Sequence, residues 1–208
     1  SLSQANELVS SFKQVAVDQA SSQRRRFDLK LVIEEVTATL TPIIKKTPFR
    51  LHLELAGKVA MDSYPGPIGQ VVTNLVMKSL THAFEARETG NMTLAARKRG
   101  QRQVEIVYAD DGVGISGSDM QRIFDPFFTT KLGRGGSGLG LHIVYNLVTR
   151  VLGGRIKASS QVGGGTRFEI TLPLNGPPRQ RTAISSTSST IALRGGAPPT
   201  RARRPGAC

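Results

Sequence analysis

The 208-residue chain has one cysteine, no tryptophan and only three histidines. Because Cys208, the last residue, is the only cysteine, no internal disulfide can form and zinc sites built on paired cysteines are excluded. We therefore expect a reducing compartment. No apolar run reaches the roughly 18 residues that cross a bilayer, and the first residues do not resemble a secretory signal. The sequence therefore predicts a soluble, cytoplasmic piece. The missing initiator Met indicates a fragment of a longer protein, and any membrane anchor would belong to the missing part.

Acidic residues are also scarce, since 15 Asp and Glu stand against 28 Lys and Arg, for a net charge of +13. The excess is uneven, because residues 175–208 carry Arg but no acidic residue and are rich in Pro, Gly, Ser and Thr. We expect this segment to be a disordered basic tail. It is either an electrostatic arm for nucleic acid or membrane, or a solvated tail or read-through from cloning. Because no aromatic residues interleave with its Arg residues, the second interpretation is favoured and no nucleic-acid partner is expected.

Apolar residues in the rest of the chain recur with helical or strand periodicity. A heptad spacing over residues 1–23 predicts one helix of a bundle whose partners are missing. Asp28 is the candidate N-cap of an amphipathic helix that ends before Pro48. Further helices are expected over 68–87 and 141–152, and strands over 51–55, 58–62, 92–97, 104–108, 155–159 and 166–172. Without a regular βαβ alternation, the fold class is α+β, with one mixed or antiparallel sheet covered on one face by helices.

Two glycine clusters mark the candidate site. Asp110–Gly114 follows a predicted strand, and Gly136–Gly140 precedes a predicted helix. Backbone N–H groups of the second cluster could bind phosphate at the start of that helix. The cluster is not a P-loop, because no Gly-Lys-Ser/Thr follows it, and it lacks the strand–turn–helix context of a Rossmann turn.

A stripe of polar residues forms the third part of the candidate site. Asn74, Lys78 and His82 are spaced i, i+4 and i+8 on the helix predicted over 68–87, whose packed face carries Ser79. Alone, such a stripe is better interpreted as a solvated face. Together with the two glycine clusters it indicates a site.

These segments resemble, in order, the N, G1, F, G2 and G3 boxes of sensor histidine kinases, which belong to the wider superfamily of gyrase, Hsp90 and MutL. The boxes are Gln70–Leu75, Asp110–Gly114, Phe124–Phe128, Gly136–Gly140 and Gly163–Thr166. The resemblance covers about residues 27–174 and implies an ATP-binding catalytic domain with the Bergerat-type α/β sandwich. Residues 1–23 resemble the second helix of the dimerisation and phosphotransfer domain of such kinases.

The resemblance implies ATP as cofactor and a set of nucleotide contacts. These contacts are Asn74, Lys78, His82, Asp110, Gly112, Gly114, Lys131, Gly136, Gly138, Leu139, Gly140 and Thr166. Asp110 would accept a hydrogen bond from the adenine amine with support from Thr166, and Gly112 and Gly114 would let the backbone approach the base. The segment 129–137 resembles the mobile ATP lid, whose Lys131 would meet the phosphates.

The resemblance also implies which reaction is favoured. Relatives that hydrolyse ATP place a Glu four residues before the metal-binding Asn, and this chain has Asn74 there, an amide that cannot act as a base. Phosphoryl transfer to a His on a separate bundle domain of the same kinase is therefore favoured, with a response regulator as the indirect partner. None of His52, His82 and His142 precedes an acidic residue, so the phosphoacceptor His is absent. We expect homodimerisation only in the full-length parent.

The main departure from the family pattern is Lys78, which stands where the metal-binding Asn is expected. A lysine ammonium cannot ligate Mg²⁺, so Asn74 is the one remaining metal ligand and Mg²⁺ binding is expected to be impaired. Lys78 either pairs with the phosphates, which impairs transfer, or points to solvent while water replaces the lost ligand. The alternative to an active kinase domain is a catalytically weak nucleotide-binding pseudokinase or docking module.

Overall fold

The computed structural model describes residues 23–85, 87–129 and 138–178. Three predicted segments lie mostly outside these ranges: the bundle helix at 1–23, the lid at 129–137 with Lys131 and Gly136, and the basic tail at 175–208.

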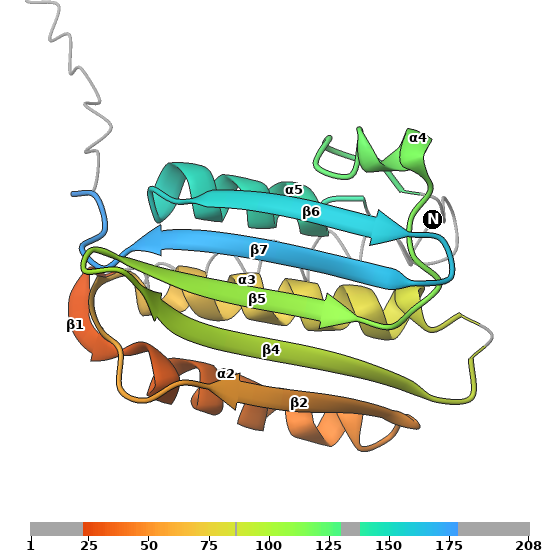
Figure 1. Ribbon diagram of the computed structural model, residues 1–208, viewed down its shortest axis with the longest axis horizontal. Helices are drawn as coiled ribbons and strands as arrows, with labels where there is room; N and C mark the ends of the chain where they lie inside the picture. The colour runs from red at the N-terminus through yellow and green to blue at the C-terminus, as the bar shows by residue number, and fades with distance from the viewer. Residues whose placement is uncertain (1–22, 86, 130–137, 179–208) are drawn as a thin grey trace, which may run out of the picture.

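A five-stranded sheet forms the front layer of the domain in Figure 1. Its strands are β2 (Phe49–Leu55), β4 (Gly90–Arg99), β5 (Gln103–Asp110), β6 (Arg155–Gln161) and β7 (Gly165–Pro173). The spatial order is β2-β4-β5-β7-β6, with β2 and β4 parallel and the other neighbours antiparallel. The sheet is mixed, which confirms the predicted α+β class.

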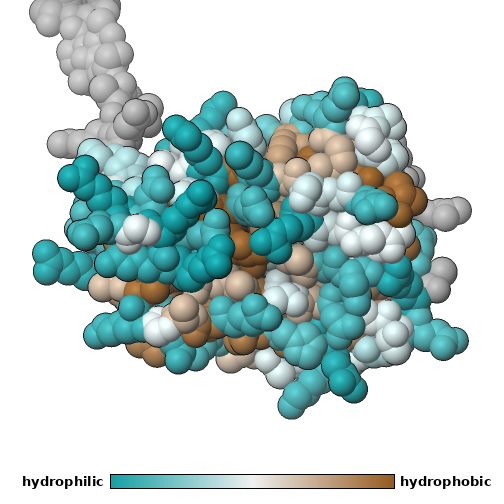
Figure 2. All heavy atoms as spheres, in the orientation of Figure 1, coloured by the Kyte–Doolittle hydropathy of each residue, from teal (hydrophilic) through white to brown (hydrophobic). Residues whose placement is uncertain are grey.

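The long helices of the domain lie behind the sheet and cover one of its faces (Figure 1). The helical elements are α2 (Leu29–Ile44), α3 (Pro65–Lys78) with the π-helical turn η1 (Ser79–Ala83), the short α4 (Gly117–Met120), and α5 (Gly140–Asn146) with the π-helical turn η2 (Leu147–Val151). The opposite, open face of the sheet is largely hydrophilic in Figure 2. Among the described residues, no helix combines the length and apolarity needed to cross a membrane.

The core lies between the sheet and the helices, as period-2 strands and period-3.6 helices require. Leu94, Ile106 and Ile170 come from three adjacent strands and are almost completely buried. Leu75 on α3 and Val144 on α5 pack into the same core. Burial of this kind is the main favourable term in folding and holds the helices against the sheet.

The start of the domain is capped as predicted. The Asp28 carboxylate accepts from the backbone N–H of Lys30 at 3.1 Å and also from that of Val59 at 3.1 Å. Asp28 closes β1 (Arg25–Asp28), which pairs antiparallel with β3 (Ala60–Ser63). The sequence did not predict β1, because its arginines carry no apolar alternation.

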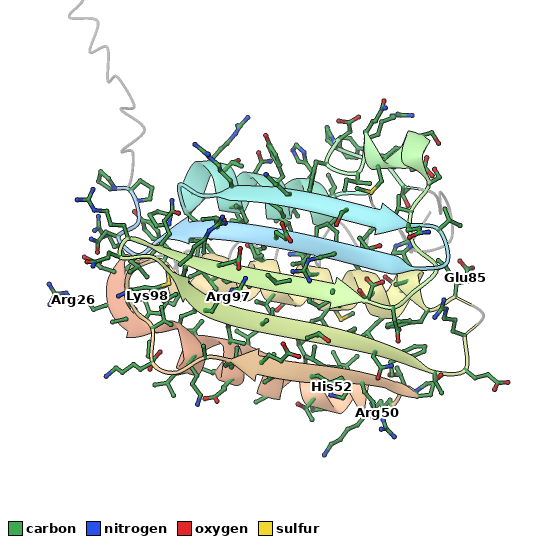
Figure 3. All side chains as sticks on the ribbon, in the orientation of Figure 1. Arg26, Arg50, His52, Glu85, Arg97 and Lys98 are labelled. Carbon is green, nitrogen blue, oxygen red and sulfur yellow. The ribbon has the colours of Figure 1, made fainter. Side chains whose placement is uncertain are left out.

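The helices predicted over 68–87 and 141–152 each widen into a π-helical turn at the C-terminal end, and the first ends at Ala83, four residues earlier than predicted. The strand prediction for 51–55 holds, and His52 points outward, with Nε2 3.3 Å from Asn91 Oδ1. Figure 3 shows His52 and Arg50 on β2, the edge strand. Leu53 is 41% exposed despite its alternation, because an edge strand has a neighbour on one side only.

Contacts of the domain continue beyond residue 174. Asp62 forms a parallel bridge with Asn175, and the Tyr64 hydroxyl donates to the Pro177 carbonyl at 2.8 Å. Residues 175–177 therefore pack beside β3 as part of the described fold.

Candidate functional site

A pocket of about 330 Å³ opens at the end of the domain where β5 finishes and α4 lies (Figure 1). Of the predicted contacts it gathers Asn74, Lys78, His82, Asp110, Gly114, Gly138, Gly140 and Thr166. Gly112 and Leu139 are adjacent in the chain to lining residues but do not line the pocket. Residues separated by more than 90 positions thus share one concave surface, which agrees with the sequence-based grouping.

Asp110 is the most enclosed charged group of this pocket, at 8% exposure. One carboxylate oxygen, Oδ1, accepts from the backbone N–H groups of Gly112 at 3.1 Å and Thr166 at 3.2 Å. The other, Oδ2, accepts from the Ser79 hydroxyl at 2.8 Å. A carboxylate offers about four acceptor positions, so these three donors leave one position on Oδ2.

The environment of Asp110 also acts on its protonation. Burial raises the pKa of its carboxyl above the usual range, the hydrogen bonds from Ser79, Gly112 and Thr166 oppose that rise, and the neighbouring Asp111 charge adds to it. Burial outweighs the hydrogen bonds. The site therefore holds a carboxylate whose charge is costly and which gains from any further donor.

Ser79 is itself supported from the sheet. The Tyr108 hydroxyl donates to Ser79 Oγ at 2.8 Å, and both residues are at most 1% exposed. Burial raises the pKa of the Tyr108 phenol far above its usual value, so this group stays protonated and acts as a donor. Sequence reasoning placed Ser79 on the packed face but missed its hydroxyl contact, and it missed Tyr108 altogether.

Thr166 supports Asp110 through its backbone rather than its side chain. Its hydroxyl lies 3.1 Å from Ser160 Oγ, which in turn donates to the Gly165 carbonyl at 2.6 Å and accepts from the Ile115 N–H at 2.8 Å. Ser160 thereby ties the loop after β5 to the turn between β6 and β7. Sequence reasoning missed Ser160, whose place in a polar stretch gave no signal.

The glycines after β5 are required by the protein's own backbone. A side chain at Gly112 would collide with the Ala83 carbonyl, and one at Gly114, where φ is +73°, would collide with the Gln161 carbonyl. Either collision would displace a neighbouring backbone segment. These two glycines hold the loop flush against η1 and β6, which keeps Asp110 in place.

The opposite end of the pocket is more open. Asn74 donates from Nδ2 to the Gln70 carbonyl at 2.9 Å, and its Oδ1 faces Gly140 at the start of α5. Lys78 and His82 follow on the same side of α3 and η1, with Lys78 half-buried. Glu85 and Asp119, which the sequence analysis did not select, add two carboxylates to the lining, and Figure 3 shows Glu85 beyond the end of η1.

Aromatic residues lie beside the pocket in the segment 124–128. Phe124 packs against Tyr145 with ring centroids 5.3 Å apart, and the Phe124 carbonyl lies 2.9 Å from His142 Nδ1. Phe127 has φ of 64° and is 69% exposed, and its backbone lies against Gly138. His142 therefore contributes to structure by joining α5 to this segment.

The residues fit adenine but fit Mg²⁺ poorly. The remaining acceptor position of Asp110 matches an amine donor in a pocket wide enough for a purine. The polar stripe offers one amide oxygen, from Asn74, followed by the Lys78 ammonium. Over residues 23–85, 87–129 and 138–178, no group of three or more His, Cys, Asp or Glu is placed to hold a metal ion.

Comparison with known proteins agrees with this geometry. Residues 64–176 match the family model described as "Histidine kinase-, DNA gyrase B-, and HSP90-like ATPase". The sensor histidine kinase RcsC of Escherichia coli K12 is 31% identical over 173 residues, which cover 79% of this chain and 17% of RcsC. The sensor histidine kinase ZraS of Klebsiella oxytoca is 41% identical over 112 residues, which cover 54% of this chain and 23% of ZraS. The chain thus spans less than a quarter of either relative.

Solved structures show the same fold. The catalytic domain of histidine kinase ThkA, in a nucleotide-free form, matches with a TM-score of 0.65 and 26% identity over 74% of this chain and 97% of that domain. Full-length ShkA in complex with AMPPNP matches with a TM-score of 0.65 and 22% identity over 85% of this chain and 37% of ShkA. The predicted resemblance is confirmed, and since the family model matches more than half of its length, the chain belongs to the family of histidine kinase-, DNA gyrase B- and HSP90-like ATPases.

Proposed function

We propose that this chain is the ATP-binding catalytic domain of a sensor histidine kinase and serves transfer of the ATP γ-phosphoryl group to a His on a separate bundle domain. The observation that carries the proposal is the anchored Asp110 carboxylate, which keeps one acceptor position at the pocket. Membership of an ATP-binding family and the likeness to the ThkA catalytic domain support it.

Asp110 favours adenine over guanine for an electrostatic reason. The exocyclic amine of adenine donates to the free acceptor position, whereas guanine presents a carbonyl oxygen at the same place, and two facing acceptors repel. The cost rises with burial, because neither oxygen can turn to water instead. We expect ATP to bind more tightly than GTP.

Asn74 favours transfer over hydrolysis. Its amide occupies the place where a general base for water would stand, and an amide takes no proton at neutral pH. During transfer, a nitrogen of the acceptor imidazole bonds to the γ-phosphorus, the bond from that phosphorus to the bridging oxygen breaks, and ADP leaves with that oxygen. This chain's residues bind and orient ATP for that step.

We expect the acceptor to come from another domain. His52 lies on an edge strand of the sheet, and His142 contacts the Phe124 carbonyl. His82 lines the pocket as a predicted nucleotide contact and, like the other two, does not precede an acidic residue. We propose that the bundle domain of the same parent kinase supplies the acceptor, that a response regulator receives the phosphoryl group afterwards, and that the parent works as a dimer in the cytoplasm. The names of the relatives, which are sensor histidine kinases, support this assignment.

Lys78 changes how the phosphates are held. At a separation of about 4 Å and an effective dielectric constant of about 20, its ammonium would repel a divalent cation by about 8 kcal/mol. The same charge attracts a triphosphate. We therefore propose that Lys78 pairs with the phosphates and that ATP binds this chain with little dependence on Mg²⁺.

Calorimetric titration of ATP with Mg²⁺ and with EDTA tests the proposal in this chain and in Lys78→Asn. We expect similar affinities under both conditions for the unaltered chain and a clear gain from Mg²⁺ for Lys78→Asn. Equal Mg²⁺ dependence in both proteins would contradict the role of Lys78. If the unaltered chain binds ATP neither with Mg²⁺ nor with EDTA, the proposed function is contradicted.

Lys78 also favours a second candidate, a nucleotide-binding pseudokinase that acts by docking to a partner. Phosphoryl transfer relies on a metal that this residue disfavours. Transfer from [γ-³²P]ATP to an added bundle domain of the parent kinase separates the two. Labelled His on that domain supports the kinase, whereas ATP binding and domain binding without label support the docking module.

A further inference from the structure

We propose that Ser79 and Tyr108 are positioning residues that fix the Asp110 carboxylate for recognition of the purine amine. The inference rests on the proposed function, because it assumes that ATP occupies the pocket. Neither side chain lines the pocket, so both act through Asp110 and not by touching the nucleotide.

The three groups form a one-way relay of hydrogen bonds. Tyr108 on β5 donates to Ser79 at 2.8 Å, and Ser79, the first residue of η1, donates to Asp110 Oδ2 at 2.8 Å. The order is set by chemistry, because a carboxylate only accepts and a Ser hydroxyl has a single proton. Because the Ser79 proton points to Asp110, Ser79 Oγ can only accept from Tyr108. The Tyr108 hydroxyl is therefore the donor of that second bond.

The relay acts on the oxygen that meets the ligand. Oδ1 is held by two backbone donors, Gly112 and Thr166, whereas Oδ2 is held by Ser79 alone. Without the Ser79 hydroxyl, Oδ2 would have two open acceptor positions, and the carboxylate could rotate about its bond to Cβ. With it, one position remains, and its direction is set by the sheet through Tyr108.

The bond from Tyr108 also makes Ser79 a stronger donor to Asp110. Hydrogen bonds that are linked in a chain strengthen one another, and a buried site amplifies the effect. Tyr108, Ser79 and Asp110 are each at most 8% exposed, so water does not compete with the relay. The relay therefore holds Oδ2 in one orientation, which favours ligands that place a donor opposite this oxygen.

The test compares two ligands that differ at one group. ATP carries the exocyclic amine, and purine ribonucleoside triphosphate lacks it. We expect Ser79→Ala in the 208-residue chain to weaken ATP binding about 10-fold, because the bond from the purine amine to Asp110 loses its alignment, and to leave binding of the amine-free triphosphate unchanged. A residue that only supported the fold would weaken both ligands equally.

A second variant separates positioning from damage to the fold. Ser79→Ala leaves the buried Tyr108 hydroxyl without its acceptor and should lower the midpoint temperature of thermal unfolding. The double variant Ser79→Ala/Tyr108→Phe removes that hydroxyl and should recover part of the lost midpoint temperature. We expect the double variant to keep the ATP-specific loss. Recovery of ATP affinity together with the midpoint, equal loss for both triphosphates, or no loss for ATP would each overturn the proposal. Failure of the unaltered chain to bind ATP would instead contradict the proposed function.

Discussion

The two ends of the pocket are built in different ways. At the Asp110 end, three donors from η1, β7 and the loop after β5 converge on one carboxylate, and two glycines seat that loop against backbone carbonyls. At the Asn74 end, one amide faces Gly140 across ordinary contact distance, and Lys78 lies half-buried at the end of α3. The first end is fixed by packing and tolerates few changes. The second has room, which explains how a lysine can be accommodated there without loss of the fold.

The largest effect is expected from Asp110→Asn. The amide oxygen can still accept from Gly112 and Thr166, but its NH₂ group then presents a donor where the carboxylate presented an acceptor. A donor facing the adenine amine should weaken ATP binding by about 100-fold or more. Titration with a fluorescent ATP analogue measures this loss.

Asp111→Asn is the matched control for this variant. The substitution makes the same chemical change one residue away. The Asp111 carboxylate lies outside the pocket and accepts from the backbone N–H and the side-chain amide of Asn91. We expect its ATP affinity to stay within about twofold of the unaltered chain, because surface changes of this kind cost little. Similar losses in both variants would show that Asp110 has no special relation to the base.

The next largest effect is expected on stability, when a glycine at the Asp110 end of the pocket is compared with one at the Asn74 end. Gly114→Ala places a Cβ against the Gln161 carbonyl at a φ of +73° and should lower the free energy of unfolding by about 3 kcal/mol. Gly140→Ala meets Asn74 Oδ1 at 3.4 Å, an ordinary contact, and should change it by no more than about 0.5 kcal/mol. Urea denaturation measures both values.

Gly163→Ala isolates the cost of the backbone conformation at Gly114. Gly163 has φ of +80°, and no atom lies within 4 Å of the place that a Cβ would take, so alanine there should cost about 1–2 kcal/mol from conformation alone. The excess loss in Gly114→Ala is then the collision with Gln161. If the two variants lose the same free energy, the loop after β5 is not held as tightly as we describe.

The same contrast explains what the sequence could predict. Asp110, the glycine clusters and the stripe from Asn74 to His82 are local spacings, and apart from Gly112 and Leu139 the structure brings the described contacts among them to one pocket. The contact of Tyr108 with Ser79 joins a strand to a helix end 29 residues away, and no local pattern encodes it. The π-helical turns were missed for a related reason, since a periodicity of 3.6 residues does not distinguish an α-helix from a final widened turn. Sequence patterns therefore identified the groups that line the pocket better than the groups that hold them in place.

The smallest effect concerns pH and tests how strongly Asp110 is enclosed. Burial raises the pKa of its carboxyl in the folded chain above the value of about 3.9 for an exposed Asp, so the folded state holds the proton more tightly than the unfolded state. The stabilising contribution of that proton is complete below a pH of about 3.9 and is lost as the pH rises through the folded-state pKa. Asp110→Asn has no such group. The unfolding free energy of the unaltered chain minus that of Asp110→Asn should therefore fall with rising pH over this window and then level off.

Ser79→Ala sharpens this measurement, because the Ser79 hydrogen bond lowers the pKa of Asp110 and opposes the effect of burial. Without that bond the folded-state pKa rises further, so the decline should extend to higher pH than in the unaltered chain. Urea denaturation of the three proteins at a series of pH values provides the comparison. A difference that instead rises with pH would mean that the hydrogen bonds to Asp110 outweigh its burial. The contrast between the enclosed Asp110 end and the more open Asn74 end would then have to be drawn from packing alone.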